Sequence, residues 1–142
     1  MGIEAHLIAQ HYFSATFASD APLVEKIQSL ELDFLPEGWV VNTLRCTPLK
    51  WYKDYHIIDW FIKNCEASYD SEVRIDPNDL KRLRDECSQI LANEEFAETL
   101  IPESHGDYDD WYYDNIKMTH DELDKILSHP MFDKWEFSLC IC

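Results

Sequence analysis

Residues 48–65 have the sequence PLKWYKDYHIIDWFIKNC, which contains two of the five tryptophans of the chain. Several apolar side chains in this stretch recur at steps of three and four, the spacing that places them on one face of a helix. These residues are Trp51, Tyr55, Ile58, Phe61, Ile62 and Cys65. Pro48 suits the first helical turn, where its missing N–H is not needed, and Thr47 is the expected N-cap. The stretch therefore predicts a helix over residues 48–65 at the centre of one core.

The patterns on both sides of this stretch predict further helices and strands. In chain order we expect a strand at 3–10, a short helix capped by Asp20, a strand at 39–46, an extended piece at 72–75, a helix at 77–93 capped by Asp76, one helical turn at 95–100, a helix at 107–128 and a strand at 135–142. The last strand alternates apolar and polar residues, so it is expected to pair antiparallel with an early strand. The predicted fold is α+β, a small antiparallel sheet of the N-terminal and C-terminal strands packed against three main helices, in one domain over residues 1–142.

The charge of the chain restricts its partners. Twenty-eight acidic residues against twelve basic ones give a net charge of −16, which disfavours direct contact with nucleic acid or anionic membranes. No run of eighteen apolar residues and no signal-peptide pattern is present. The five cysteines are odd in number and irregularly spaced, which is typical of reduced thiols. We expect a cytoplasmic protein.

The acidic residues are concentrated in one part of the chain. Residues 85–116 hold ten Asp and Glu and no Lys or Arg, and such an imbalance creates a strong local potential. Trp111 and Tyr113 flank the helical stripe position Tyr112, so at least one of them is expected to be exposed, as aromatic anchors of interfaces are. The predicted partner-binding residues are Glu94, Glu95, Glu98, Glu103, Asp107, Asp109, Asp110, Trp111, Tyr113 and Asp114. The other interpretation is a solvated loop that keeps the protein soluble.

No pattern in the sequence identifies a catalytic, metal or cofactor site. Asp107 and Asp109 have the spacing of the first two EF-hand ligands, but Tyr112 and Met118 stand where Gly and Glu are required. The three glycines cannot form a phosphate-binding loop, and Cys140 and Cys142 alone do not make a zinc site. We therefore expect no cofactor and no metal, and we leave open whether the chain is an enzyme, with a non-enzymatic role as the preferred interpretation.

Three segments resemble a family of small bacteriophage and prophage proteins. They are MGIEAHLIAQHYF, KWYKDYHIIDWFIKNC and DYDDWYYDNIK. Members of the family begin with a Met-Gly-Leu-Asp-Met-Tyr-Leu type strand and carry a Tyr-Trp-Arg-Lys-Ala-Asn type helix. The matching positions are Met1, Gly2, Leu7, Trp51, Lys53, Ile57, Trp60, Phe61, Tyr108, Asp109, Trp111 and Tyr112. The chain departs from the family at Tyr52, Tyr55 and Ile58, which replace Arg, Asn and His, and at the short Ser104-His105-Gly106 loop. The resemblance implies a viral origin and no particular chemistry.

These observations lead to one preferred function and two alternatives. The preferred function is that of an acidic phage-encoded protein that binds and inhibits a host protein with a basic surface. Such an inhibitor would act against host defence or in host takeover. One mechanism for this inhibition is mimicry of nucleic acid. The first alternative is a protein that binds or cleaves a small nucleotide signal, which needs convergent cations from Lys50, Lys53, Lys81, Arg82 and Arg84. The second alternative is a self-assembling structural accessory. The oligomeric state is left open.

Overall fold

A computed structural model describes residues 2–142, so Met1, one of the positions matched above, lies outside the described residues. Four strands form a single sheet: β1 (Glu4–Tyr12), β2 (Thr43–Tyr52), β3 (Glu72–Ile75) and β4 (Glu136–Ile141). Their order across the sheet is β2-β1-β4-β3, and all neighbouring pairs are antiparallel. The α+β prediction is therefore confirmed, as is the antiparallel pairing of the C-terminal strand with an early strand, which is β1.

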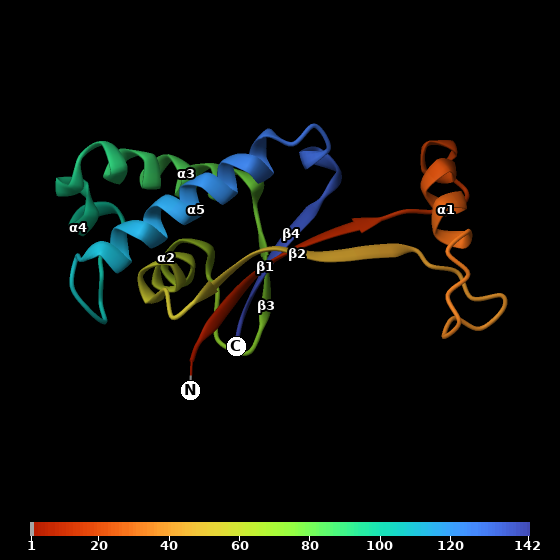
Figure 1. The fold of residues 1–142 in the computed structure, drawn as a ribbon, viewed down its shortest axis with the longest axis horizontal. Helices are drawn as coiled ribbons and strands as arrows, with labels where there is room; N and C mark the ends of the chain where they lie inside the picture. Colours follow the sequence, from red (N-terminus) through yellow and green to blue (C-terminus); the bar gives the residue numbers. More distant parts are fainter. Residues whose placement is uncertain (1) are drawn as a thin grey trace.

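Four helices pack beside this sheet, and together with the sheet they form what we call the main body. They are α2 (Tyr55–Cys65), α3 (Pro77–Ala92), the short α4 (Ala97–Leu100) and the long α5 (Asp110–Ser128). Helices α3 and α5 pack on each other, and both lie with α2 on the same side of the sheet (Figure 1). A further helix, α1 (Ala21–Gln28), and three 3-10 turns, η1 (Ala18–Asp20), η2 (Glu94–Phe96) and η3 (Phe132–Lys134), complete the fold. Among residues 2–142 no helix has the length and apolar content that a membrane crossing requires.

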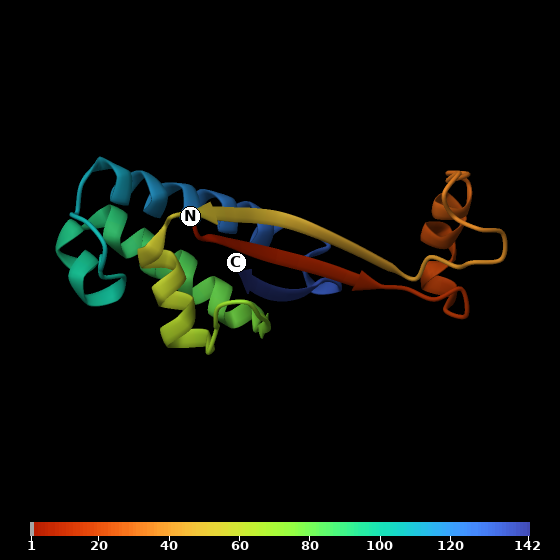
Figure 2. The same cartoon turned by 90° about the horizontal axis from the view of Figure 1, so that it is seen from below.

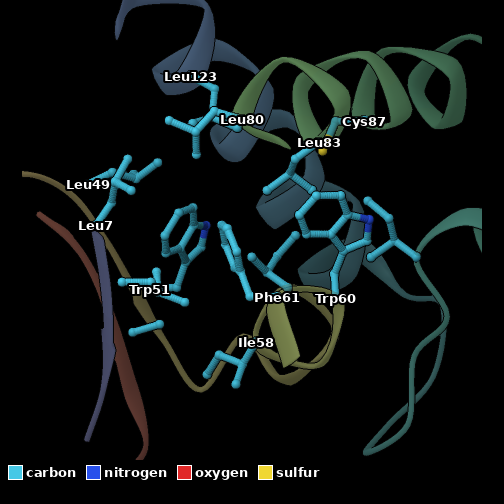
Figure 3. Packing of buried hydrophobic residues seen from close by; sticks show 14 of the residues in the cluster. Leu7, Leu49, Trp51, Ile58, Trp60, Phe61, Leu80, Leu83, Cys87 and Leu123 are labelled. Carbon is cyan, nitrogen blue, oxygen red and sulfur yellow. The ribbon is translucent and has the colours of Figure 1, made fainter. Parts of the chain in front are cut away.

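The core lies between one face of the sheet and these helices. Alternate residues of β4, namely Phe137, Leu139 and Ile141, are buried against the helices, as the period of two along the strand requires. Trp51 of β2 is fully buried, and its ring centroid lies 5.4 Å from that of Phe61 on α2. Figure 3 shows these two rings meeting between the sheet and the helices. Residues of the sheet and of the helices therefore pack together in one core.

The predicted helix over residues 48–65 is wrong in its first part. Residues up to Tyr52 belong to strand β2, and the helix begins only at Tyr55. Pro48 lies in the edge strand, where a missing N–H can face solvent, at a point where the pairing with β1 shifts register. Thr47 is therefore an exposed strand residue and not a helix cap. Trp51 still enters the predicted core, but it does so from the sheet.

The predicted strand at 39–46 is also displaced. Trp39, Val40 and Val41 precede β2, which begins at Thr43. Gly38 adopts φ +87° and the N–H of Trp39 donates to the carbonyl of Pro36 across 3.2 Å, an arrangement typical of a type II turn. Strands β1 and β2 therefore continue outward as a long hairpin, and residues 14–42 form a lobe at its far end (Figures 1 and 2). We call residues 14–42 the distal lobe.

The helix-capping predictions have different outcomes. The Asp76 carboxylate accepts a hydrogen bond from the backbone N–H of Asn78 at 2.8 Å, so it caps α3 as expected. Asp20 occupies the N-cap position of α1, but its carboxylate accepts from the N–H of Ser14 at 3.0 Å instead. The carboxylate thus links the residue before α1 to Ser14, the first residue of the distal lobe, and leaves α1 without a side-chain cap.

Candidate functional site

The predicted partner-binding residues gather at one end of the helical layer. The end of α3, the turn η2, α4 and the start of α5 are consecutive there, at the end of the molecule opposite to α1 (Figure 1). We call residues 94–114 the acidic end. The exposed carboxylates of the acidic end belong to Glu94, Glu95, Glu98, Asp107, Asp109, Asp110 and Asp114. Among residues 2–142 none of these seven forms an ion pair with Lys, Arg or His.

Two of these acids also stabilise helix α5. The Asp109 carboxylate accepts a hydrogen bond from the backbone N–H of Tyr112 at 3.1 Å and so caps the helix. Asp110 lies in the first turn, where a negative charge is favoured by the helix dipole. Asp109 therefore has a structural role that does not depend on any partner.

Glu103 differs from the other predicted acids because its side chain points inward and is only 8% exposed. One carboxylate oxygen lies 3.3 Å from Nδ1 of His56. The other accepts hydrogen bonds from the backbone N–H groups of Ser104 and His105, both at 2.9 Å. Glu103 thus fixes the loop between α4 and α5 to the first turn of α2, and we exclude it from the exposed binding surface. Its pairing with His56 could not be found from the sequence, because 47 positions separate the two residues.

Asp54 is a second buried carboxyl group close to Glu103. It is 3% exposed, and its Oδ1 atom has no hydrogen-bond partner among residues 2–142. The pKa of Asp54 is raised to about 6, mainly by burial and to a smaller extent by the charge of Glu103, while a backbone hydrogen bond at Tyr52 opposes the shift. A carboxyl group that titrates near pH 6 makes this cluster sensitive to pH.

His56 completes the buried cluster at the start of α2. Its side chain is 1% exposed and its ring packs on Tyr112 of α5, with centroids 4.6 Å apart. Burial lowers the pKa of His56, while the charge and hydrogen bond of Glu103 oppose the change. The Tyr112 hydroxyl donates to the carbonyl of Ile101 at 2.6 Å, which also holds the loop in place. The side chains of this cluster are buried, so they stabilise the loop of the acidic end and are not accessible to a substrate.

Short polar contacts on the surface above the cluster do not form a catalytic triad. The Ser104 hydroxyl donates to the Asp59 carboxylate at 2.5 Å and contacts Nδ1 of His105 at 2.7 Å. In a Ser-His-Asp triad the carboxylate orients the histidine, which then accepts the serine proton. Here the carboxylate binds the serine directly, and the His105 ring stacks on Tyr55. The arrangement closes the loop onto α2 and does not prepare a nucleophile.

Trp111 and Tyr113 have unequal exposure. Trp111 is 57% exposed beside the carboxylates of the acidic end. Tyr113 is half-buried and meets the Tyr112 ring edge to face, with centroids 4.9 Å apart. The prediction that an aromatic next to Tyr112 would be exposed is confirmed. Trp111 is therefore the aromatic residue most available as an anchor for a partner.

The cations required for a nucleotide site are dispersed. Arg82 lies over the Trp60 ring and approaches Glu86, whereas Arg84 contacts Asp85 and Asp124. Lys81 lies over the Phe132 ring, Lys53 over Tyr52, and Lys50 is opposite His6 in the sheet. The cavities described for this chain include none of the five. This distribution counts against the first alternative function.

No metal-binding cluster was found, and known proteins provide no match. Among residues 2–142 no three His, Cys, Asp or Glu side chains converge as metal ligands would. Comparisons with family models, curated proteins and solved structures found no match.

Proposed function

We propose that this chain is a viral interaction protein that binds a basic surface of a host protein through its acidic end and thereby blocks the activity of that host protein. The observation that carries the proposal is the set of seven exposed carboxylates, none of them in an ion pair within residues 2–142, around the exposed indole of Trp111. The resemblance to bacteriophage proteins favours the viral origin.

The electrostatics of the acidic end suit a basic partner. Clustered charges of one sign attract an oppositely charged surface, accelerate its association and repel acidic proteins. A surface that normally binds nucleic acid phosphates carries the required positive charge. Trp111 would supply the apolar anchor that charge alone does not provide. The buried contacts of Glu103 hold the loop in one conformation, which lowers the entropy cost of binding.

The test compares two variants with equal changes in charge. Asp107→Lys with Asp114→Lys reverses two exposed charges of the acidic end, and Asp133→Lys with Glu136→Lys reverses two exposed charges elsewhere. Each tagged variant and the unmodified protein are used to capture proteins from a bacterial lysate, which are identified by mass spectrometry. We expect a basic protein captured by the unmodified chain and by the control variant, and lost from the first variant.

The captured protein is then studied in purified form. Its affinity should fall at least tenfold in the first variant and in Trp111→Ser, and should weaken with rising salt because exposed charges are screened. Its own activity should be inhibited by the unmodified chain. An acidic partner, or equal capture by both double variants, would show that the acidic end is not the binding surface.

A further inference from the structure

The distal lobe exposes five large apolar side chains. Phe34 is 82% exposed and Trp39 is 69% exposed, and Phe17, Leu30 and Val40 are also exposed. Within residues 14–42 only Val24 is buried. A segment with one buried residue gains little from its own core, so its exposed apolar groups can become buried only against another molecule. Large exposed apolar patches on soluble proteins mark interaction sites.

A groove lies between α1 and the following loop. It has a volume of about 210 Å³, and its accessible lining is divided about equally between polar and apolar atoms. The apolar lining includes Val24, Ile27, Leu35, Trp39 and Val40, and two carboxylates, those of Glu31 and Glu37, also line it. An engineered protein cavity of about 150 Å³ holds one benzene molecule. The groove therefore has room for one large apolar side chain.

The charge of the lobe selects among the molecules that could fill the groove. Residues 14–42 contain Asp20, Glu25, Glu31, Asp33 and Glu37 against a single base, Lys26. A second copy of this chain would bring the same negative lobe, and a like charge opposes association. A positively charged segment with an apolar side chain matches both the cavity and its carboxylates.

We propose that the distal lobe binds a short segment of another protein in which one bulky apolar residue is flanked by Lys or Arg. The apolar side chain enters the groove beside Trp39, and the flanking cations pair with Glu31 and Glu37. In peptide recognition, a pocket commonly binds one anchor side chain, and charged residues at the rim of the pocket contribute specificity. The lobe lies at the end of the molecule opposite to the acidic end (Figures 1 and 2), so it is a second and separate binding surface.

The test is selection from a library of random twelve-residue peptides displayed on yeast, with the complete protein as bait. The enriched peptides should share a Leu, Met, Phe or Trp flanked by Lys or Arg. Synthetic copies of the best peptide should bind at least tenfold more weakly to Trp39→Ser, and also to Glu37→Lys, which leaves the apolar groove intact. Trp111→Ser removes a tryptophan at the opposite end that is also more than half exposed, and it should bind normally.

Three results would overturn the proposal. The first is enrichment of no peptide or of peptides without the apolar and basic pattern. The second is equal binding to Trp39→Ser, Glu37→Lys and the unmodified chain, or loss of binding in Trp111→Ser. The third is a concentration-dependent dimer in light scattering that Trp39→Ser abolishes, which would assign the groove to a second copy. A peptide that binds the acidic end would be recognised by its loss of binding to Trp111→Ser, so failure here is distinguishable from failure of the proposed function.

Discussion

The indole Nε1 of Trp51 donates a hydrogen bond to Oγ1 of Thr119 across 2.9 Å in the interior of the protein. Both side chains are fully buried, one on the edge strand β2 and the other on α5. The bond links the sheet to the helix whose first turn belongs to the acidic end. Disturbing it should therefore affect stability without changing the exposed surface.

Thr119→Val should destabilise the protein by about 2 kcal/mol, because the valine fills the same space but leaves the buried indole N–H of Trp51 without a partner. Thr119→Ser keeps the hydroxyl and should retain the hydrogen bond, with a smaller loss from the missing methyl group. Urea denaturation followed by circular dichroism measures both. Equal losses in the two variants would show that packing and not the hydrogen bond determines the stability at this position.

Glu103→Ala should destabilise the protein by about 3 kcal/mol. The substitution removes the partner of buried His56 and the acceptor of two backbone N–H groups. Glu98→Ala, in the exposed part of the acidic end, should hardly change the urea midpoint. Hydrogen exchange of residues 102–108 should accelerate in the first variant only. Unchanged exchange there would contradict the role of Glu103 in fixing the loop.

Asp54 should make stability depend on pH in a defined window. Its pKa is about 6 in the folded protein against an ordinary value of 3.8, so folding favours the protonated carboxyl group. The associated stability is fully present below pH 3.8 and is lost as the pH rises through 6. A shift of this size corresponds to about 3 kcal/mol.

Asp54→Asn removes this titration. The free energy of unfolding of the variant minus that of the unmodified protein should rise between pH 4 and pH 7 and then level off. Urea denaturation across this range measures the difference, and any loss that does not depend on pH cancels from its slope. A difference that stays constant from pH 4 to pH 7 would show that Asp54 titrates normally.

Asp109 allows its capping role to be separated from its charge. Asp109→Ala should cost about 1 kcal/mol because the N–H of Tyr112 loses its acceptor, whereas Asp109→Asn can still accept that bond. Under the proposed function, Asp109→Asn should weaken binding of the captured host protein without a matching loss of thermal stability. If Asn and Ala variants lose stability equally, the carboxylate acts through its charge on the helix and not through the cap.

The sequence by itself determined the elements whose signals are local. Asp76 and Pro77 mark the start of α3 by satisfying or removing the N–H groups that a helix cannot pair internally. The alternation of Phe137, Leu139 and Ile141 identifies β4, because a strand places alternate side chains on one face. The exposure of at least one of Trp111 and Tyr113 was also predicted, since the stripe position of Tyr112 leaves a neighbouring aromatic residue outside the core.

Only the tertiary structure decided where the strand ends and the helix begins within residues 48–65. Trp51 fits a helical stripe and a strand core equally well, and the choice depends on backbone pairing of β2 with β1, about forty residues away in sequence. The inward position of Glu103 likewise depends on His56, which the sequence does not connect to it. Local patterns record the period of an element, whereas hydrogen bonding and burial between distant segments decide which period is used and which charges remain at the surface.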